Sequence, residues 1–298
     1  MIAAIGFFDG VHLGHQFLLR QVKAEALQRG LRPAVVTFNQ HPLQVVHPGT
    51  EPPLLTTPEE KFELLKAYGI EEIVMMDFTH ELSLLPARTF MKRLHDNYGI
   101  RGLVIGYDHR FGHNREEGFE QYAEYGRELG IDVIQATAYR EADKTVSSSA
   151  IRALLAEGQL EEANRLLGHP YTLRGIVVEG RHMGRKLGFP TANIRPDTPH
   201  KMIAKNGVYA VKVQIDEEEK TRYGMMSIGT RPTLHNGTDQ SIEIHLFNFS
   251  DMIYGRRLKV DVTRRTRDEQ RFASLDDLKA RLGQDKEEIS RHFEQRLP

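Results

Sequence analysis

The amino-acid sequence predicts an α/β domain with a parallel sheet, followed by a small antiparallel β-barrel with a C-terminal helix. The chain has 298 residues, which is long for a single hydrophobic core. Its first half alternates apolar runs with segments of helical periodicity, whereas from about Tyr171 short alternating runs follow one another without helices. We expect the domains to meet near His169 and Pro170, as residues 1–169 and 170–298.

Each apolar run of the first half is followed by a segment with helical periodicity. Strands separated by helices of this length need right-handed crossovers, which produce a parallel sheet covered on both faces. Ligands of such folds bind at the carboxyl ends of the strands, where residues 6–15, 38–42 and 106–118 are expected. The expected strands are residues 2–5, 34–38, 73–78, 102–106 and 132–136. The expected helices are residues 15–29, a helix opened by a capping box at 57–60, and residues 86–98, 116–129, 148–157 and 160–167.

The second half contains closely spaced strand patterns. Residues 216–220 form a charged hairpin between two of them, and short strands without intervening helices are typical of a small antiparallel barrel. The strand patterns include residues 209–215, 221–228, 241–247 and 257–265, and residues 274–296 have a helical pattern.

Composition excludes several classes of function. The 40 basic and 41 acidic side chains give a net charge of −1, without the basic excess of proteins that follow a nucleic-acid backbone. The chain has no cysteine, which excludes disulfides, thiolate nucleophiles and cysteine-based zinc sites. Apolar runs are too short to cross a membrane, and the first residues do not resemble a signal peptide. We expect a cytoplasmic monomer or weak oligomer with small-molecule partners, no nucleic acid and no membrane.

The segment GFFDGVHLGH, residues 6–15, follows the first expected strand. Gly6 and Gly10 allow tight turns, and Gly14 leaves space at the start of the next helix, whose N–H groups attract anions. His12 and His15, three residues apart on the first turn, could donate to the same anion. Zinc binding is disfavoured because no glutamate lies between them. Loop histidines satisfied by the backbone remain the structural alternative.

The segment TVSSSAIR, residues 145–152, lies at another expected strand-to-helix turn. Its hydroxyl and N–H groups could hold phosphate oxygens, with Arg152 as the counter-charge. Ser147 or Ser148 would serve equally well as a helix N-cap, and the residues alone favour the cap.

The segment GRHMGRKLGFPTANI, residues 180–194, resembles a flexible basic loop near phosphates but lacks the spacing of a Walker motif. Thr191 and Asn193 are neutral oxygen ligands, suited to a magnesium ion already balanced by nucleotide phosphates. Its glycines and basic residues are Gly180, Gly184, Gly188, Arg181, Arg185 and Lys186.

Glu243 lies on the strand face opposite Ile242, Ile244 and Leu246. Periodicity alone favours a solvated carboxylate on a strand. As a functional residue, Glu243 would be a general base for an alcohol.

Together these motifs resemble the bacterial bifunctional riboflavin kinase/FAD synthetases. GFFDGVHLGH, GYDHRFG, VSSSAIR, GRKLGFPTANI, SIGTRPTL and EIHLFNF…IYGRRL occur in the family's order and span essentially the whole chain. H-x-G-H alone indicates only the wider nucleotidyltransferase superfamily, but its combination with PTAN is highly specific. The resemblance implies a nucleotidyltransferase-like, Rossmann-like α/β domain followed by a six-stranded riboflavin kinase barrel.

The resemblance also implies two reactions. The barrel would transfer the γ-phosphoryl of ATP to the 5′-hydroxyl of riboflavin, with Thr191 and Asn193 binding Mg²⁺ and nucleotide and Glu243 acting as base. The first domain would adenylylate the resulting FMN to FAD, releasing pyrophosphate, while His12 and His15 stabilise charge on the phosphates. Further residues expected to bind substrate or ATP are Gly6, Phe8, Asp9, Gly14, Asp108, Ser147, Ser148, Arg152, Gly180, Gly184, Arg185 and Pro190.

The sequence departs from the family pattern at several positions. His109 replaces a frequent Phe, which we expect to alter the flavin-side pocket; Ser149 replaces a frequent Thr, and Ser227 a common Asn. Relatives usually carry a short leader, whereas this sequence starts within the first strand. We therefore expect either a truncated start or a less protected sheet edge, which could weaken the adenylylation domain, and the alternative function is a riboflavin kinase alone.

Overall fold

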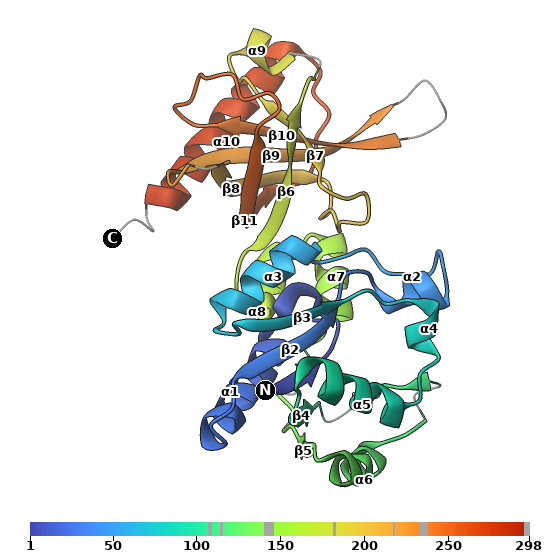
Figure 1. The fold of residues 1–298 in the computed structure, drawn as a ribbon. Helices are drawn as coiled ribbons and strands as arrows, with labels where there is room; N and C mark the ends of the chain where they lie inside the picture. Colours follow the sequence, from blue (N-terminus) through green and yellow to red (C-terminus); the bar gives the residue numbers. More distant parts are fainter. Residues whose placement is uncertain are drawn as a thin grey trace. The chain divides into compact units, whose positions relative to one another are not determined.

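The computed structural model describes residues 1–106, 109–113, 116–139, 146–180, 183–216, 218–232 and 238–294 (Figure 1). The chain divides into two compact units, Met1–Ala150 and Ile151–Pro298. Each unit has its own sheet, and each is described separately below.

The first unit contains a five-stranded parallel sheet with the order β3-β2-β1-β4-β5, which confirms the predicted α/β architecture. β1 is the central strand, because Ile2 pairs with Pro33 on one side and with Gly102 on the other. The expectation of a less protected sheet edge at this strand is therefore wrong. The strands are β1 (Ile2–Ile5), β2 (Pro33–Phe38), β3 (Glu72–Met76), β4 (Gly102–Ile105) and β5 (Asp132–Gln135).

Two hydrophobic clusters cover the two faces of this sheet. Successive side chains of a strand point to opposite faces, so Ile2 packs with Leu19 and Leu65, whereas Ala3 packs in the other cluster with Phe90. The helices of this unit are α1 (Leu13–Gln28), α2 (Pro42–Val46), α3 (Pro58–Ala67), α4 (His80–Ser83), α5 (Ala87–Tyr98) and α6 (Phe119–Leu129), with a short 3-10 turn η1 (Asp9–Val11).

The capping box expected before α3 is present: Thr57 and Glu60 each accept, through the side chain, a hydrogen bond from the other's backbone N–H. For α6, the predicted start at residue 116 is wrong, because this helix begins at Phe119. The carbonyl oxygens of Glu116 and Glu117 accept hydrogen bonds from Arg110 instead of pointing along a helix.

The second unit contains a closed six-stranded barrel with the order β10-β7-β6-β11-β8-β9, in which every pair is antiparallel. This confirms the predicted barrel, and the C-terminal helix is also present. The strands are β6 (Tyr171–Val178), β7 (Ala192–Pro196), β8 (Gly207–Ile215), β9 (Thr221–Pro232), β10 (Thr238–Leu246) and β11 (Arg257–Arg267). The remaining helices are α7 (Ser148–Glu157), α8 (Leu160–Leu167), α9 (Met183–Leu187) and α10 (Leu275–Glu294).

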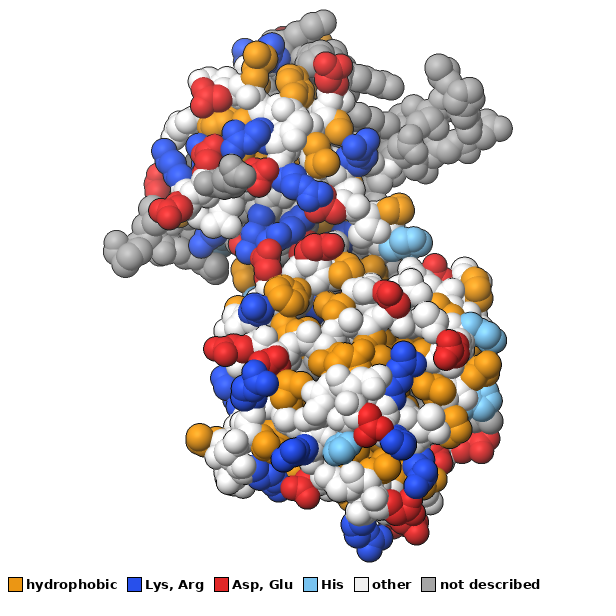
Figure 2. Space-filling view, in the orientation of Figure 1, with side chains coloured by type: hydrophobic (Ala, Val, Ile, Leu, Met, Phe, Trp, Pro, Cys, Tyr) orange, Lys and Arg blue, Asp and Glu red, His pale blue; other side chains and the backbone are white. Residues whose placement is uncertain are grey.

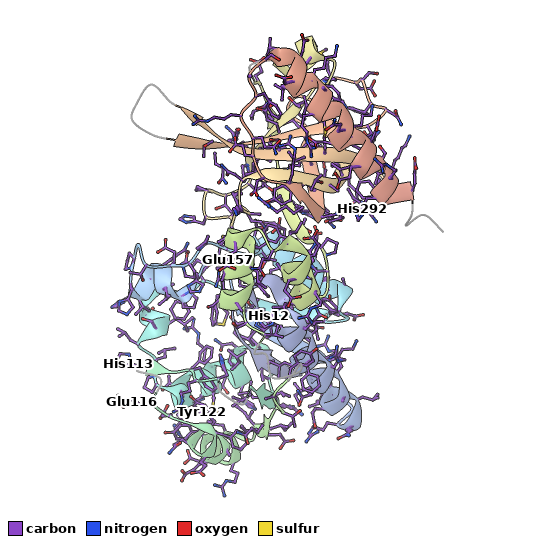
Figure 3. All side chains as sticks on the ribbon, turned by 180° about the vertical axis from the view of Figure 1, so that it is seen from behind. His12, His113, Glu116, Tyr122, Glu157 and His292 are labelled. Carbon is purple, nitrogen blue, oxygen red and sulfur yellow. The ribbon has the colours of Figure 1, made fainter. Side chains whose placement is uncertain are left out.

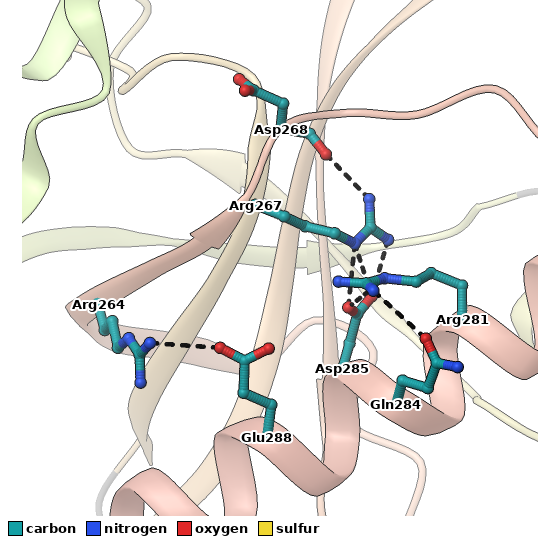
Figure 4. A network of polar contacts seen from close by, with 7 residues as sticks. All are labelled: Arg264, Arg267, Asp268, Arg281, Gln284, Asp285 and Glu288. Atoms are coloured by element: carbon teal, nitrogen blue, oxygen red, sulfur yellow. Dashed lines mark hydrogen bonds and ion pairs between the residues drawn. The ribbon is translucent and has the colours of Figure 1, made fainter.

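α10 covers part of the outer surface of the barrel and lies against β9 (Figure 1). A buried ion-pair network holds its centre in place (Figure 4). Asp285 is fully buried, and its carboxylate accepts hydrogen bonds of 2.7 to 3.0 Å from Arg267 of β11 and pairs with Arg281. α10 packs on the barrel through what we call the outer cluster: Val208, Ala210, Met225, Ile289 and Phe293, with Phe189, Tyr223, Phe247 and Leu282 partly buried against them.

Basic and acidic side chains are interspersed on the face of the molecule shown in Figure 2. None of the helices within the described ranges combines the length and apolar character that a membrane span requires.

Candidate active sites

The loop between β1 and α1 has an unusual backbone. Phe8, Gly10 and Val11 have φ angles of 56°, 79° and 39°, in the left-handed region. A positive φ is a clear outlier for a β-branched residue such as Val11, and such backbone persists only where the surroundings hold it. A Cβ on Gly6 would lie 3.0 Å from the ring of Phe8, so this glycine lets the buried ring fold back onto the strand end.

Asp9 holds this loop in place. Its carboxylate accepts hydrogen bonds from the backbone N–H groups of Leu55 and Thr56, at 3.0 and 2.9 Å, and from the Thr56 hydroxyl at 3.1 Å. The N–H of Gly10 donates to the same hydroxyl at 3.0 Å. Asp9 thus positions the loop through these bonds, and direct contact of its carboxylate with a substrate stays a prediction.

His12 and His15 lie together at the start of α1, where Figure 3 labels His12. His12 is the N-cap residue, and its Nδ1 accepts a long hydrogen bond of 3.4 Å from the N–H of His15. The two rings are stacked, with centroids 3.7 Å apart and planes 18° from parallel. Because Nδ1 of His12 accepts, its Nε2 carries the proton in the neutral ring and can donate to a ligand.

His15 is electrostatically prepared for an anion. Its Nδ1 atom is buried and has no hydrogen-bond partner within the described residues. Burial lowers the pKa of His15 well below its usual range, and the charges of His12, Lys61 and His109 lower it further. A negative group placed here would therefore both satisfy the ring and relieve the repulsion.

Lys61 is a functional candidate that the sequence analysis missed. It is 1% exposed, and its ammonium donates to the carbonyl oxygens of Phe7 and Phe38, at 3.1 and 2.7 Å, just beyond β1 and at the end of β2. Burial lowers its pKa to about 8, which the carboxylate of Asp9 partly opposes. Its position next to a capping box gave no signal, because lysines on helices are usually exposed.

The serine cluster reaches the same loop. Ser147 acts as an N-cap by accepting a hydrogen bond of 3.2 Å from the N–H of Ala150, and Ser148 donates to the carbonyl oxygen of Asp9 at 2.9 Å. The start of α7 is therefore joined to the loop of the histidine pair. Arg152 follows one turn later on α7. Asp108 lies outside the described residues.

Glu243 and Thr191 form the centre of the second candidate site. The Thr191 hydroxyl donates to Oε2 of Glu243 at 3.0 Å. Asn193 of β7 and Ser227 of β9 are paired with Glu243 on either side, so three polar side chains share one row on the outer face of the barrel. The predicted face of Glu243 is confirmed, because the alternate residues of β10 are buried in the interior: Ile242, Ile244 and Leu246.

Two glycines allow the close approaches at this site. A Cβ on Gly180 would lie 2.1 Å from the amide nitrogen of Asn193, and one on Gly184 would lie 2.3 Å from the carbonyl oxygen of Phe189. Either substitution would displace the segment that carries Thr191. Arg185 is exposed on α9, and Pro190 precedes Thr191, whereas Arg181 and the side chain of Lys186 lie outside the description.

The oxygen donors near Glu243 are suited to Mg²⁺ shared with a nucleotide. One hydroxyl and one amide group, both neutral, lie there beside a single carboxylate, a set of oxygen donors with little charge of its own. Across the described parts of the chain, no group of three His, Asp or Glu side chains could hold a metal ion by itself. The donor set therefore fits a metal that arrives with nucleotide phosphates.

Comparisons with known proteins assign different family models to the two parts of the chain. A model of the FAD synthetase family matches residues 1–150, and a model of the riboflavin kinase family matches residues 167–293. The bifunctional riboflavin kinase/FMN adenylyltransferase of Escherichia coli K12 is 38% identical over 95% of this chain and 90% of its own length. The enzyme of the same description from Listeria monocytogenes is also 38% identical, over 98% of this chain and 92% of its own length.

Among solved structures, a crystal structure described as a macrolide-efflux protein from Streptococcus pneumoniae has a TM-score of 0.85 and 31% identity. The match covers 96% of this chain and 92% of the chain in that structure, so both units have counterparts of the same fold there. The two family models place the FAD synthetase domain before the riboflavin kinase domain, and the curated relatives carry both activities in their description. The chain therefore belongs to the bifunctional riboflavin kinase/FMN adenylyltransferase family.

Proposed function

We propose that the site around Glu243 phosphorylates riboflavin and that the site around His12 and His15 adenylylates the resulting FMN. The chain is a bifunctional riboflavin kinase and FMN adenylyltransferase, with the adenylyltransferase at the N-terminal end. The assignment of residues rests above all on the convergence of Thr191, Asn193 and Glu243 from two separate strands and the preceding turn.

In the kinase reaction, Glu243 accepts the proton of the riboflavin 5′-hydroxyl as its oxygen attacks the γ-phosphorus of ATP. The Thr191 hydroxyl orients the carboxylate, and Asn193 contributes its amide oxygen to the nucleotide end of the site. Gly180 and Gly184 let the backbone approach the phosphates, and Arg185 adds positive charge nearby. Mg²⁺ bound with ATP would neutralise charge on the phosphates.

In the adenylyl transfer, a phosphate oxygen of FMN attacks the α-phosphorus of ATP, and the bond to pyrophosphate breaks. His12 donates from Nε2, and His15 from its ring, to phosphate oxygens on which negative charge increases. Ser147, Ser148 and Arg152 assist from the start of α7, and the backbone of Gly6 to Gly14 lines the phosphate path. No covalent intermediate with the protein is required.

The proposal requires riboflavin, FMN and ATP as partners and needs no nucleic acid or membrane. We also propose a monomer or weak oligomer in the cytoplasm, where both steps have access to ATP. The boundary at residues 169 and 170 is our proposal for where the catalytic domains divide, since α7 and α8 precede the first barrel strand.

Chromatographic analysis of the products tests this proposal. Riboflavin, ATP and Mg²⁺ should give FMN and then FAD, and FMN with ATP and Mg²⁺ should give FAD and pyrophosphate. Formation of FMN in the first mixture, with no FAD in either mixture, would instead support the alternative of a riboflavin kinase alone. Omission of Mg²⁺ with a chelator present should stop FMN formation.

A further inference from the structure

His245 lies on β10 two residues after Glu243, so the two side chains share the outer face of the barrel. It is 6% exposed, and its Nδ1 lies 2.8 Å from the carbonyl oxygen of Pro190, the residue before Thr191. β10 therefore holds two consecutive residues of the same turn, Pro190 through His245 and Thr191 through Glu243.

The contact with Pro190 defines the protonation of the ring. A carbonyl oxygen can only accept, so Nδ1 of His245 carries a proton and donates it. Burial lowers the pKa of His245, the bond to Pro190 partly opposes this, and the charge of Lys286 on α10 lowers the pKa again. The ring is consequently a neutral Nδ1–H donor around neutral pH.

Neighbouring rings hold the imidazole in position. Phe189 meets it edge-on with centroids 5.3 Å apart, and Phe247 lies at 5.8 Å. Both phenylalanines belong to the outer cluster. The ring of His245 is thus held in place partly by Phe189, the residue that precedes Pro190.

We propose that His245 is a positioning residue of riboflavin phosphorylation, which holds the Pro190 carbonyl so that the Thr191 hydroxyl meets the Glu243 carboxylate. This inference rests on the proposed kinase role of Glu243 and Thr191. Without the bond, the carbonyl of Pro190 loses its contact with β10, and the hydroxyl and amide oxygens that follow lose their alignment with the base. Such a displacement affects the chemical step more than the binding of riboflavin.

Three substitutions separate this role from packing alone. His245→Asn places an amide N–H near the position of Nδ1, His245→Gln places it near Nε2, and His245→Leu removes the donor. Met225→Leu is the matched control, because Met225 is paired with His245 across the strands and belongs to the outer cluster but lacks a polar group. Adenylylation of added FMN by the same molecules is a second control.

We expect His245→Leu and His245→Gln to lower the kcat of FMN formation roughly 10- to 100-fold, while the KM for riboflavin changes less than about threefold. His245→Asn should recover most of the lost kcat, and Met225→Leu should keep the wild-type kcat. Rates are expressed per folded molecule, and circular dichroism measures the folded fraction of each variant. If His245→Leu does not fold, His245→Gln, which keeps a polar side chain of similar length, replaces it.

Two results would overturn the inference: a wild-type kcat in His245→Gln and His245→Leu, or a loss in His245→Asn as large as that in His245→Leu. Failure of the wild-type protein itself to form FMN would refute the proposed function instead. The two failures are therefore distinguishable in one set of assays.

Discussion

Thr191 and Glu243 are 52 residues apart in the chain, and the Thr191 hydroxyl donates a hydrogen bond of 3.0 Å to the Glu243 carboxylate. This bond orients the carboxylate of β10 by means of the turn that leads into β7. The proposed nucleotide ligand and the proposed base are therefore aligned with each other before any substrate binds.

Replacing Glu243 by glutamine tests the base. The amide oxygen can still accept from Thr191, so the site should keep its shape while losing its proton acceptor. We expect FMN formation to fall by about 100-fold or more. FAD formation from added FMN should stay within about twofold of wild type, because the first unit has its own site. Glu219→Gln, on the exposed hairpin between β8 and β9, is the matched control. A parallel loss of both activities would contradict our division of labour.

His15→Asn tests the anion site of the first unit. The pKa of ligand-free His15 is lowered, so the ring is neutral near pH 6.5, and a polyanion that stabilises the imidazolium raises that pKa. Binding of ATP should therefore take up protons, and its affinity should rise as the pH falls. Calorimetric titrations in two buffers of different ionisation enthalpy measure this uptake.

The His15→Asn variant should take up fewer protons than wild type, form little FAD, and keep its riboflavin kinase activity. The protonation of ATP itself is common to both proteins, so the difference between them isolates the histidine. Equal proton uptake in the two proteins would show that His15 does not meet the phosphates.

Lys61→Met tests the cost of burying an ammonium. The folded-state pKa of about 8 lies below the usual lysine value of 10.5, so the unfolded chain binds more protons between these values. The contribution of Lys61 to stability thus becomes more favourable as the pH rises from 8 to 10.5, by about 3 kcal/mol. The variant should lack this rise, whereas Lys66→Met, an exposed change on the same helix, should retain it. Thermal unfolding at several pH values between 7 and 10.5 gives the comparison, and parallel curves for wild type and Lys61→Met would refute it.

Asp285→Ala tests the ion-pair network between α10 and β11 (Figure 4). The substitution leaves Arg267 without its bidentate partner in a buried place, and breaking a buried pair in this way costs about 3–5 kcal/mol. Glu288→Gln, which removes the half-exposed partner of Arg264, should cost less than about 1 kcal/mol. Because the chain has no tryptophan, urea unfolding is best followed by circular dichroism. Similar losses in the two variants would show that burial does not decide the strength of this network.

Much of the architecture was predictable because hydrophobic periodicity is local. The helix Leu160–Leu167 and the strand Ile2–Ile5 have the predicted bounds, and the face of Glu243 follows from its alternating neighbours. The start of α6 was not predictable in the same way. There the carbonyls of two glutamates are bound by Arg110, a contact outside the helical pattern.

The sequence analysis missed two candidate site residues for the same reason. Lys61 and His245 are polar residues at buried positions, and each donates hydrogen bonds to backbone carbonyl oxygens of other segments. Neither contact follows from spacing along the chain, because the partner is chosen by the packing of distant elements.

The sequence by itself determined the two-domain order, the family, and the motifs that bring His12, His15, Thr191 and Glu243 into consideration. These depend on local patterns and on residue types that chemistry restricts. Only the tertiary structure decided that β1 is central, that Asp9 holds a loop, and that β10 binds both Pro190 and Thr191. Strand order and long-range hydrogen bonds come from the closure of the sheet and barrel, which no local pattern specifies.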